Sequence, residues 1–215
     1  MKVVLPACIS QTQSAFVPGR LITDNALVAF EMFHTLKNKK KGSKGFYALK
    51  LDMTKAYDRV EWHFLEAMMK KMGFHSQWID YIMRCIKSVS YSIVINGKIS
   101  NYFKPGRGLR QGDPLSPYLF LICTEGLSAM LAKAQNDGLL KGFKASRNGP
   151  SVTHLFFADD SILFARAEKE ESKRVKHMLH LYEQHFGQMI NVSKPALFFG
   201  PNTRNEFKEK NQRPV

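Results

Sequence analysis

The four residues from Phe157 to Asp160, with the sequence FADD, stand between two runs of strand-forming residues, Val152–Phe157 and Ser161–Ala165. This pattern predicts a strand, a tight turn and a second strand, with two adjacent carboxylates at the bend. Asp is common in turns because its side chain accepts hydrogen bonds from nearby backbone N–H groups. Two neighbouring carboxylates repel each other, however, and a bound divalent cation would supply the counter-charge. The hairpin is therefore either a solvated turn or one half of a metal site.

A second acid follows another predicted strand, earlier in the chain. The run Gly45–Leu51 reads as a strand, and Asp52 stands at its end, 107 positions before Asp159. That separation allows two strands of one sheet to bring both acids together. Mg²⁺ is commonly held by one or two carboxylates together with substrate phosphates, and a pair of such ions can clamp the attacking and leaving oxygens of a phosphoryl transfer. The alternative is that Asp52 is an ordinary residue at a strand end.

The composition indicates a globular protein with a polyanionic partner. Its 215 residues are 44% hydrophobic and include 16 Phe, enough for a core in one or two domains. The net charge of +14 favours nucleic acid over a membrane surface as the partner. The three cysteines are scattered, unlike a zinc site, and indicate a reducing compartment. Pro6 breaks the apolar start and no run has the length of a membrane span, so we expect an intracellular protein, nuclear or cytoplasmic, without a signal peptide.

Periodicity and turn residues predict the elements around the two strands. Helices are expected from Thr23 or Asp24 toward Lys37, from about Trp62 to Gly73, from Ser76, from Ser116 to about Asp137, and from about Lys169 to Gly187. The pair Asn96-Gly97 predicts a type I′ hairpin, Ala196–Phe199 a last strand, and residues 201–215 a polar tail that frays. This order is a split βαβ arrangement of the α+β class, an antiparallel sheet with helices on one face.

Several segments carry a family resemblance. The stretch LKLDMTKAYDRVEW (Leu49–Trp62) resembles motif A of reverse transcriptases, GLRQGDPLSPYLF (Gly108–Phe120) resembles their motif B, and FADD resembles their motif C. The segments QSAFVPGRLITDN (Gln13–Asn25) and GQMINVSK (Gly187–Lys194) are similar to flanking segments of non-LTR, LINE-type retroelements, particularly plant ones. The five segments occur in the family's order and together span most of the chain.

The resemblance implies a fold and an activity. Residues 46–200 would form the palm of a right-handed polymerase, 1–45 a partial fingers segment, and 201–215 the polar tail. The activity would be RNA-directed DNA polymerisation, with Mg²⁺ (or Mn²⁺), deoxynucleoside triphosphates, an RNA template and a DNA primer. The rival is a catalytically silent retroelement remnant that at most binds nucleic acid. An unrelated palm-type nucleotide cyclase would not explain RQGDPLSP.

The resemblance also assigns roles to the acids. Asp52 and Asp159 are the expected metal ligands, the main-chain oxygen of Met53 is a further one, and Asp160 is a weaker one because adjacent hairpin residues seldom face one point. Lys194 occupies the place of the motif D lysine, the proton donor to the leaving pyrophosphate. The alternative for Lys194 is an exposed lysine at a strand edge.

Other assigned residues would contact the nucleotide and the template. Tyr57 would exclude a ribose 2′-hydroxyl, or else be a buried core tyrosine. Gln111 and Gly112 would meet the incoming nucleotide, at the start of a helix whose free N–H groups attract negative charge. Arg107 and Arg110 suit template phosphates, and Arg20 is a further candidate template contact. His154 is expected to be a strand residue and not a metal ligand.

We also expect the chain as given to polymerise poorly. Only twelve residues precede Gln13, and none of them is the arginine of the family's triphosphate-binding fingers segment. The polar sequence after Gly200 shows no apolar periodicity typical of a helical thumb. By these expectations the chain is a truncated copy that lacks the upper fingers and the thumb.

Overall fold

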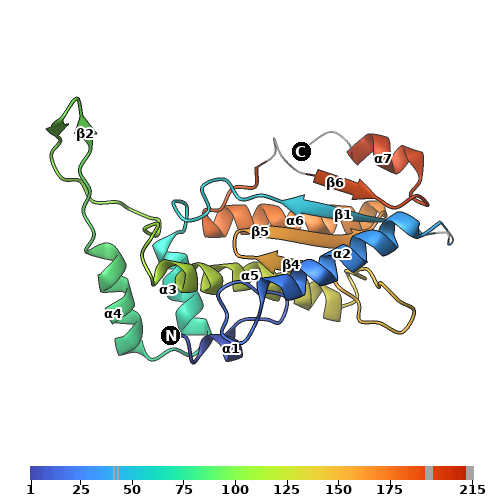
Figure 1. Ribbon diagram of the computed structural model, residues 1–215, viewed down its shortest axis with the longest axis horizontal. Helices are drawn as coiled ribbons and strands as arrows, with labels where there is room; N and C mark the ends of the chain where they lie inside the picture. The colour runs from blue at the N-terminus through green and yellow to red at the C-terminus, as the bar shows by residue number, and fades with distance from the viewer. Residues whose placement is uncertain (41, 43, 192–195, 212–215) are drawn as a thin grey trace.

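The computed structural model describes all residues except 41, 43, 192–195 and 212–215, and its centre is a four-stranded sheet (Figure 1). The strands are β1 (Phe46–Leu51), β4 (His154–Phe157), β5 (Asp160–Arg166) and β6 (Ala196–Phe199), in the spatial order β4-β5-β1-β6. Every neighbouring pair is antiparallel. β1 is therefore a central strand, and both of its partners come much later in the chain.

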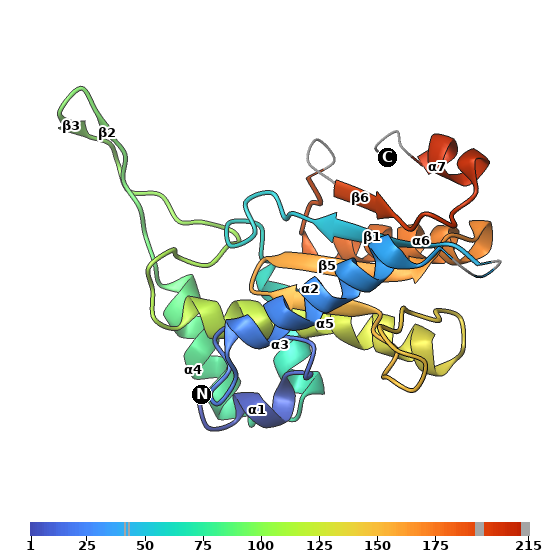
Figure 2. The same cartoon turned by 45° about the vertical axis from the view of Figure 1, so that its right-hand side comes forward.

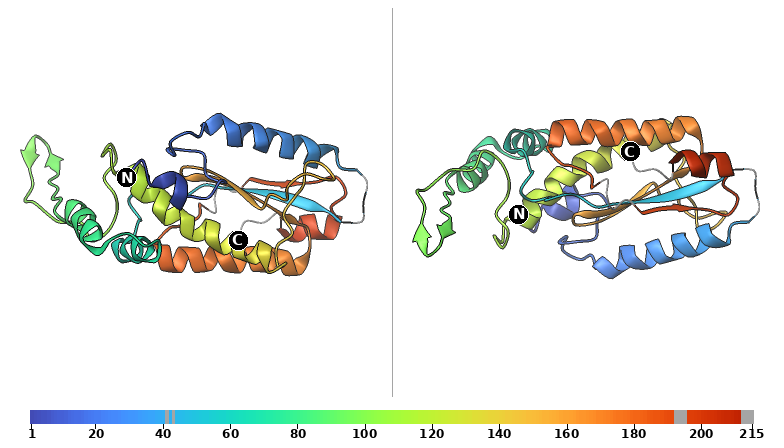
Figure 3. Two further views of the ribbon diagram at one scale, coloured as in Figure 1. Left: turned by 90° about the horizontal axis from the view of Figure 1, so that it is seen from below. Right: turned by 90° about the horizontal axis from the view of Figure 1, so that it is seen from above.

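Helices cover both faces of this sheet. The helices are α1 (Leu5–Cys8), α2 (Ile22–Asn38), α3 (Trp62–Lys71), α4 (Ser76–Lys87), α5 (Ser116–Asn136), α6 (Lys169–Phe186) and α7 (Asn205–Asn211). Figure 3 shows α5 and α6 on one side of the sheet and α2 on the other. Within the described ranges, no helix combines the length and apolarity needed to cross a bilayer. The predicted α+β class is confirmed; α2, which the sequence assigned to the fingers segment, covers the face opposite the palm helices.

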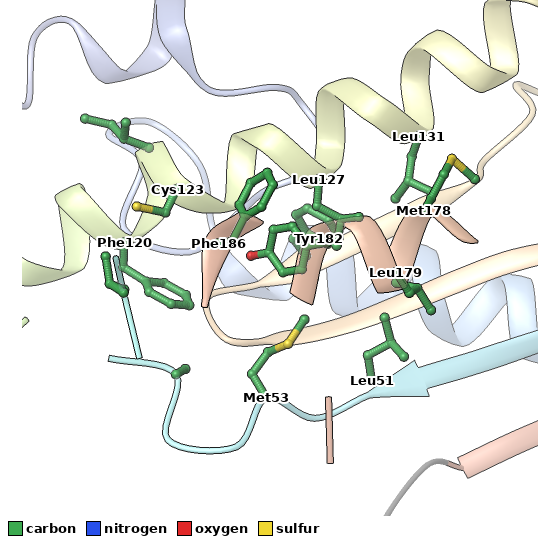
Figure 4. Close-up of a cluster of buried hydrophobic side chains, with 14 of the residues drawn as sticks. Leu51, Met53, Phe120, Cys123, Leu127, Leu131, Met178, Leu179, Tyr182 and Phe186 are labelled. Atoms are coloured by element: carbon green, nitrogen blue, oxygen red, sulfur yellow. The ribbon is translucent and has the colours of Figure 1, made fainter. Parts of the chain in front are cut away.

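The larger part of the core lies between the sheet and the helices α3, α5 and α6 (Figure 4). Leu51 and Met53 reach into it from β1 and the loop after it, Phe120 and Leu127 from α5, and Tyr182 from α6. All five side chains are buried. Because burial of one large apolar side chain contributes roughly 1.5–3 kcal/mol, this layer fixes the positions of β1 and of motif B.

A smaller core lies between the sheet and α2. Ala29, Met32 and Leu36 on α2 are buried against Ala48 of β1 and Phe164 of β5. The helix begins as expected near Asp24, whose carboxylate accepts a hydrogen bond from the backbone N–H of Leu21 at 3.0 Å. The apolar residues Leu27 and Phe30 of the same helix face away from this core and are 70% and 72% exposed.

Gly126 of α5 packs directly against Phe186 of α6. A Cβ built on Gly126 would lie 2.7 Å from Cζ of Phe186. Alanine in a helix interior normally stabilises by up to about 1 kcal/mol relative to glycine. Here the added methyl group overpacks the helix contact, so we expect Gly126→Ala to lower the free energy of unfolding by about 1–3 kcal/mol. Urea denaturation measures this change.

Two further variants test the cause of that loss. Ala129→Gly, on the exposed side of the same helix, should cost about 1 kcal/mol from helix propensity alone. Phe186→Leu should relieve the overpacking, so that Gly126→Ala costs less in that background than in the parent chain. A stabilising Gly126→Ala would contradict the described α5–α6 contact.

The hairpin of β2 (Val94–Ile95) and β3 (Lys98–Ile99) projects away from the rest of the molecule beyond α4 (Figure 2). Its two turn residues, Asn96 and Gly97, have φ values of +50° and +78°. Both values are positive, as a type I′ turn requires, so the predicted hairpin is confirmed. Val94 and Ile99 on its strands are exposed.

The C-terminal tail differs from the expectation of a frayed segment. Residues Asn205–Asn211 form α7, and Phe207 packs on the sheet there. The ring centroid of Phe207 lies 6.0 Å from that of Tyr47 on β1 and 6.1 Å from that of Phe199 on β6. A single aromatic residue anchors this short helix, and a search for apolar periodicity cannot detect one residue.

Candidate active site

Two predicted metal ligands come from adjacent strands of the sheet. Leu51, the last residue of β1, pairs with Ser161 of β5. Extending this antiparallel register by one residue brings Asp52 opposite Asp160, and Asp159 lies one residue further, in the turn between β4 and β5. We call this end of the sheet, with Asp52, Asp159 and Asp160, the acidic end. Acids from distant parts of the chain are thus placed at the same end of the sheet.

The turn between β4 and β5 is held by the N-terminal segment. Phe157 pairs with Asp160, so Ala158 and Asp159 are the two turn residues, and Ala158 has a left-handed φ of +58°. This conformation is uncommon for a residue other than glycine and costs roughly 1–2 kcal/mol. Oε1 of the buried Gln13 accepts hydrogen bonds from the N–H groups of Ala158 (3.2 Å) and Ala15 (2.9 Å). Gln13, to which the sequence assigned no role, therefore fixes the turn that carries Asp159.

The three acids lie in different surroundings. Asp160 is about half exposed, and its carboxylate lies 3.3 Å from Nζ of Lys50 on β1. Asp52 is half-buried, and its Oδ2 lies 3.4 Å from Nδ2 of Asn191. Asp159 is exposed at the turn. The Lys50 ion pair gives Asp160 a counter-charge of its own.

The backbone after β1 is held by a short bridge. Met53 forms an isolated antiparallel bridge with Ile190. The hydrogen bonds on either side of the bridge run from Asn191 N–H to Asp52 O (2.8 Å) and from Thr54 N–H to Met189 O (2.8 Å). In this pattern the carbonyl of Met53 points away from Ile190. Its oxygen is therefore compatible with the predicted role of a main-chain metal ligand.

Tyr57 lies between the acidic end and the core. Its ring stacks on Phe120 of α5, with a centroid distance of 4.9 Å and an interplanar angle of 14°. Burial raises the pKa of the Tyr57 phenol, and the negative charge of nearby Asp159 raises this pKa further. The side chain is only half-buried. Both predicted roles, sugar contact and core packing, thus agree with its position, since one part of the ring packs while another stays accessible beside Asp159.

The motif B loop is docked on the motif A loop by backbone hydrogen bonds. The N–H of Gly108 donates to Val60 O (2.8 Å), and the N–H of Leu109 donates to Tyr57 O (2.9 Å). Nε1 of Trp62 donates to Gly108 O (2.7 Å). Gly108 has a φ of +93°, and a Cβ there would lie 2.9 Å from Asp58 O. Glycine is therefore required at this position by both its conformation and its neighbours.

Gln111 and Gly112 are exposed in the loop before α5. Gly112 has a φ of +82° and no neighbour within 4 Å of a Cβ position, so its side of the loop is open. Just before α5, Oδ1 of Asp113 accepts a hydrogen bond from Leu115 N–H at 2.9 Å, and Asp113 O accepts one from Ser116 N–H at 3.1 Å. Ser116 is buried as the first residue of the helix. The structure thus places Gln111 and Gly112 before the helix start, as predicted, and Asp113 holds the turn that leads into the helix.

With this geometry in view, comparison with known proteins assigns the family. The family model described as "Reverse transcriptase (RNA-dependent DNA polymerase)" matches residues 1–211. The chain belongs to the reverse transcriptase family.

Relatives of this reverse transcriptase domain include proteins of non-LTR retroelements. The chain is 29% identical over 196 residues to the transposon TX1 uncharacterized 149 kDa protein of Xenopus laevis. This match covers 91% of the chain and 14% of the TX1 protein. It is 29% identical over 154 residues to the Pol polyprotein of retrotransposable element R2DM of Drosophila melanogaster, covering 71% of the chain and 13% of that protein. An uncharacterized mitochondrial protein of Arabidopsis thaliana is 54% identical over 68 residues, 32% of the chain and 56% of that protein. The predicted non-LTR affiliation is confirmed.

Among solved structures, the domain is similar to telomerase of Candida tropicalis. The structure of the apo form truncated from its C-terminal domain matches with a TM-score of 0.60 at 18% identity, over 83% of this chain and 35% of the telomerase chain. The reverse transcriptase domain therefore shares its fold with a part of these longer chains and spans only a minor share of their length.

The acidic end fits a metal ion of the Mg²⁺ type. Within the described residues no three His, Cys, Asp or Glu side chains converge as a metal cluster. Mg²⁺ does not require such a cage, because it keeps several waters and takes one or two carboxylates together with substrate phosphates. Asp52, Asp159 and the Met53 carbonyl are a donor set of this small, all-oxygen kind.

The three arginines that were predicted to contact the template all make hydrogen bonds or ion pairs within the reverse transcriptase domain. Arg20 donates to the backbone carbonyls of Ser10, Gln13 (2.7 Å) and Ile9 (2.8 Å), and so ties the N-terminal segment together. Nη1 of Arg107 lies 3.2 Å from Glu61, and Nη2 of Arg110 lies 3.7 Å from Asp113. Both of these side chains are about half exposed. Arg20 has a structural position, whereas Arg107 and Arg110 remain accessible beside motif B. Lys194 lies outside the described residues.

His154 is buried in a polar network that the sequence did not reveal. Its Nε2 lies 2.9 Å from the hydroxyls of both Thr12 and Ser128, and its Nδ1 lies 3.0 Å from the hydroxyl of Thr153. Burial lowers the pKa of the His154 imidazole to about 4. The neutral ring therefore joins the N-terminal segment, α5 and β4. As expected, His154 is a strand residue.

Proposed function

We propose that this domain catalyses RNA-directed addition of deoxynucleotides to the 3′-hydroxyl of a primer. The single observation that carries the proposal is the placement of Asp52 and Asp159 at the ends of adjacent strands, beside Tyr57 and the docked motif B loop. Family membership supports the reaction class. In nucleotidyl transfer of this type the protein contributes mainly positioning and charge neutralisation, and this arrangement can supply both.

Asp52, Asp159 and the Met53 carbonyl would hold two Mg²⁺ ions, with Mn²⁺ as a possible substitute. When bound, the ions supply Lewis acidity toward the α-phosphate and favour ionisation of the primer hydroxyl. Asp160 contributes negative potential while paired with Lys50. Lys194, by its place in the motif, would donate the proton to the leaving pyrophosphate.

The remaining roles concern the nucleotide and the template. The accessible part of the Tyr57 ring would meet the sugar of the incoming nucleotide. The open side of Gly112 allows a base or sugar to approach the backbone, and Gln111 can hydrogen-bond it. Arg107 and Arg110 would contact template phosphates, because half-exposed guanidinium groups can exchange a carboxylate partner for a phosphate.

A primer-extension assay tests the proposal. The purified chain is incubated with poly(rA)/oligo(dT) and dTTP, with Mg²⁺ or with a chelator. Extension that requires the metal and an RNA template supports the proposal. Because the chain as given is expected to polymerise poorly, a longer chain that adds the fingers and thumb regions is assayed beside it. Tight, salt-dependent binding of the primer–template without extension by either chain would favour the alternative, a silent nucleic-acid-binding remnant.

A steric role for Tyr57 predicts a change in sugar selectivity. We expect Tyr57→Val to reduce the preference for deoxyribonucleotides over ribonucleotides by about 10- to 200-fold, the discrimination that a pocket achieves for a difference of one methylene-sized group. Tyr57→Phe is the matched control, because it keeps the ring and should keep the preference. The measurement is the ratio of kcat/KM for dTTP and UTP. An unchanged ratio in Tyr57→Val would reassign the residue to core packing alone.

A further inference from the structure

A groove lined by lysines and arginines lies at the end of the sheet remote from the acidic end. Its volume is about 770 Å³, and it runs between the start of β1, the first half of α6 and α7. We call it the α6 groove. Its cationic residues are Lys44, Lys169, Lys173, Lys176, Arg204 and Lys210. Only two acids, Glu168 and Glu206, line it. The groove therefore has a strong excess of positive charge.

A second basic groove lies beside α2 at the same end of the sheet. Its volume is about 710 Å³, and we call it the α2 groove. Its cationic residues are Lys39, Lys141, Lys144, Arg147 and Arg166, and Glu31 is its acid. Phe46, the first residue of β1, pairs with Arg166, the last residue of β5, and both line the α2 groove. Lys44, Gly45 and Ala167, which line the α6 groove, adjoin this pair in the chain.

The two grooves lie on opposite faces of the sheet and meet at its end around the start of β1. We call the two together the basic surface, and the length of β1 separates it from the acidic end. Five residue steps from Phe46 to Leu51 correspond to roughly 17 Å along the strand. The grooves contain eleven Lys and Arg against three Glu, a local excess of eight within a chain whose net charge is +14. More than half of the net charge thus lies far from the proposed catalytic residues.

Most of these cations have no internal counter-ion. Among the described residues of the two grooves, Lys173 pairs with Glu170 (3.1 Å) and Arg166 with Glu168 (3.9 Å), and the other nine make no ion pair. Like charges gathered in this way repel one another. An anionic ligand that bridges several of them removes the repulsion, so the surface fits a polyanion better than a single small anion.

The chemistry of the surface selects among polyanions. A membrane-bound surface helix presents apolar side chains to the bilayer. The apolar face of α6 is buried in the core, however, through Val175, Met178, Leu179, Tyr182 and Phe186, so its solvent side at the groove carries lysines and no apolar anchor. A chain of evenly spaced phosphates can follow a series of lysines and arginines without specific base contacts. The ligand that best matches this surface is therefore the phosphate backbone of a nucleic acid.

We propose that the α6 groove and the α2 groove together bind the phosphate backbone of a nucleic-acid segment outside the active site. This site is separate from the candidate active site at the acidic end and does not depend on the proposed chemistry. RNA and DNA share the recognised group, so the experiment includes both.

The proposal is tested by nucleic-acid binding of the full chain. The test variant is Lys173→Ala/Lys176→Ala/Arg204→Ala/Lys210→Ala, and the control variant is Lys70→Ala/Lys71→Ala/Lys87→Ala/Lys98→Ala. The control removes the same charge from exposed lysines on α3, α4 and β3. Fluorescence anisotropy of labelled 20-nucleotide RNA and DNA is recorded at several salt concentrations, and thermal melting verifies that the variants fold.

We expect the test variant to bind at least about tenfold more weakly, and the slope of log K against log salt to fall in magnitude by about 2–3, since each lost phosphate contact contributes about 0.7. The control should retain the affinity of the parent chain within about twofold. RNA and DNA compared at equal length show which of the two sources is preferred. Equal losses in both variants, or no loss in either, would overturn the proposal.

A second measurement does not depend on substitutions. Chemical acetylation of the parent chain, read by mass spectrometry, should show Lys173, Lys176 and Lys144 protected by RNA, while Lys71 stays reactive. Protection by phosphatidylserine vesicles or by polyglutamate, but not by RNA, would replace nucleic acid with a membrane or an acidic protein and overturn the assignment. Neither measurement requires polymerisation. A failure of the proposed polymerase function is therefore distinguishable from a failure of the proposed phosphate-backbone site.

Discussion

Asp52→Asn and Asp159→Asn are each expected to lower primer extension by roughly a thousandfold or more, because each removes a carboxylate that would hold the metal ions, and the positive charge of those ions is what would stabilise the transferring phosphate. Asparagine keeps the shape of the side chain, so the fold should be unaffected. The rate is measured under single-turnover conditions with Mg²⁺. A second readout is Mn²⁺ binding followed by electron paramagnetic resonance, which should weaken in both variants whether or not the chain extends a primer.

Two other acids are matched controls for that experiment. Asp137→Asn, beyond the end of α5 and paired with Lys133 at 3.3 Å, should leave extension and Mn²⁺ binding unchanged. Asp160→Asn should have a smaller effect than Asp159→Asn, because its carboxylate is already paired with Lys50. If Asp160→Asn is the more damaging of the two, the assignment of the hairpin acids is reversed.

The buried His154 should make the fold sensitive to acid. Its pKa is lowered to about 4 in the folded chain, whereas an unfolded histidine has a pKa of about 6.5. Between these values the unfolded state binds more protons, so stability is greatest above about pH 6.5 and falls as the pH drops toward 4. The difference of about 2.5 pKa units corresponds to about 3 kcal/mol of unfolding free energy. Urea denaturation at pH 7 and at pH 4.5 measures the loss.

His154→Gln isolates the contribution of this residue. Glutamine can hydrogen-bond the hydroxyls of Thr12 and Ser128 but does not titrate, so the variant should show a flatter pH dependence even if it is less stable at pH 7. His177→Gln, on the exposed side of α6, should leave the pH dependence as in the parent chain. An unaltered slope in His154→Gln would show that other groups cause the acid sensitivity.

The sequence predicted the elements whose signals are local. Asn96-Gly97 specified its hairpin because a type I′ turn is read from two residues. The buried face of α6, including Tyr182 and Phe186, followed from helical spacing alone. The two acids of the candidate site were found because each stands next to a strand, and motif order placed the strands in one fold.

Features that depend on distant contacts were not predictable in this way. Gln13 supports the Ala158–Asp159 turn across 145 positions of the chain, and His154 meets Thr12 across 142. Phe30 is apolar, which suggests burial, but its side chain is exposed. The side of α2 that faces the sheet carries Met32 instead. The basic surface combines residues from both halves of the chain, so its charges are visible in the composition but not their location.

The sheet order has a consequence for how this chain is made. The partners of β1 in β5 lie between 110 residues downstream (Leu51 to Ser161) and 120 residues downstream (Phe46 to Arg166). At about 5–20 residues per second on the ribosome, β1 emerges roughly 6–24 s before it can pair with β5. α2 emerges earlier and contacts β1, so it can shield one face of the strand during that interval. The other face of β1 is covered only once α5 and α6 are made, and its two edges are paired only once β5 and β6 are made. The nascent chain, more than the finished domain, is therefore the state in which this protein is exposed to aggregation.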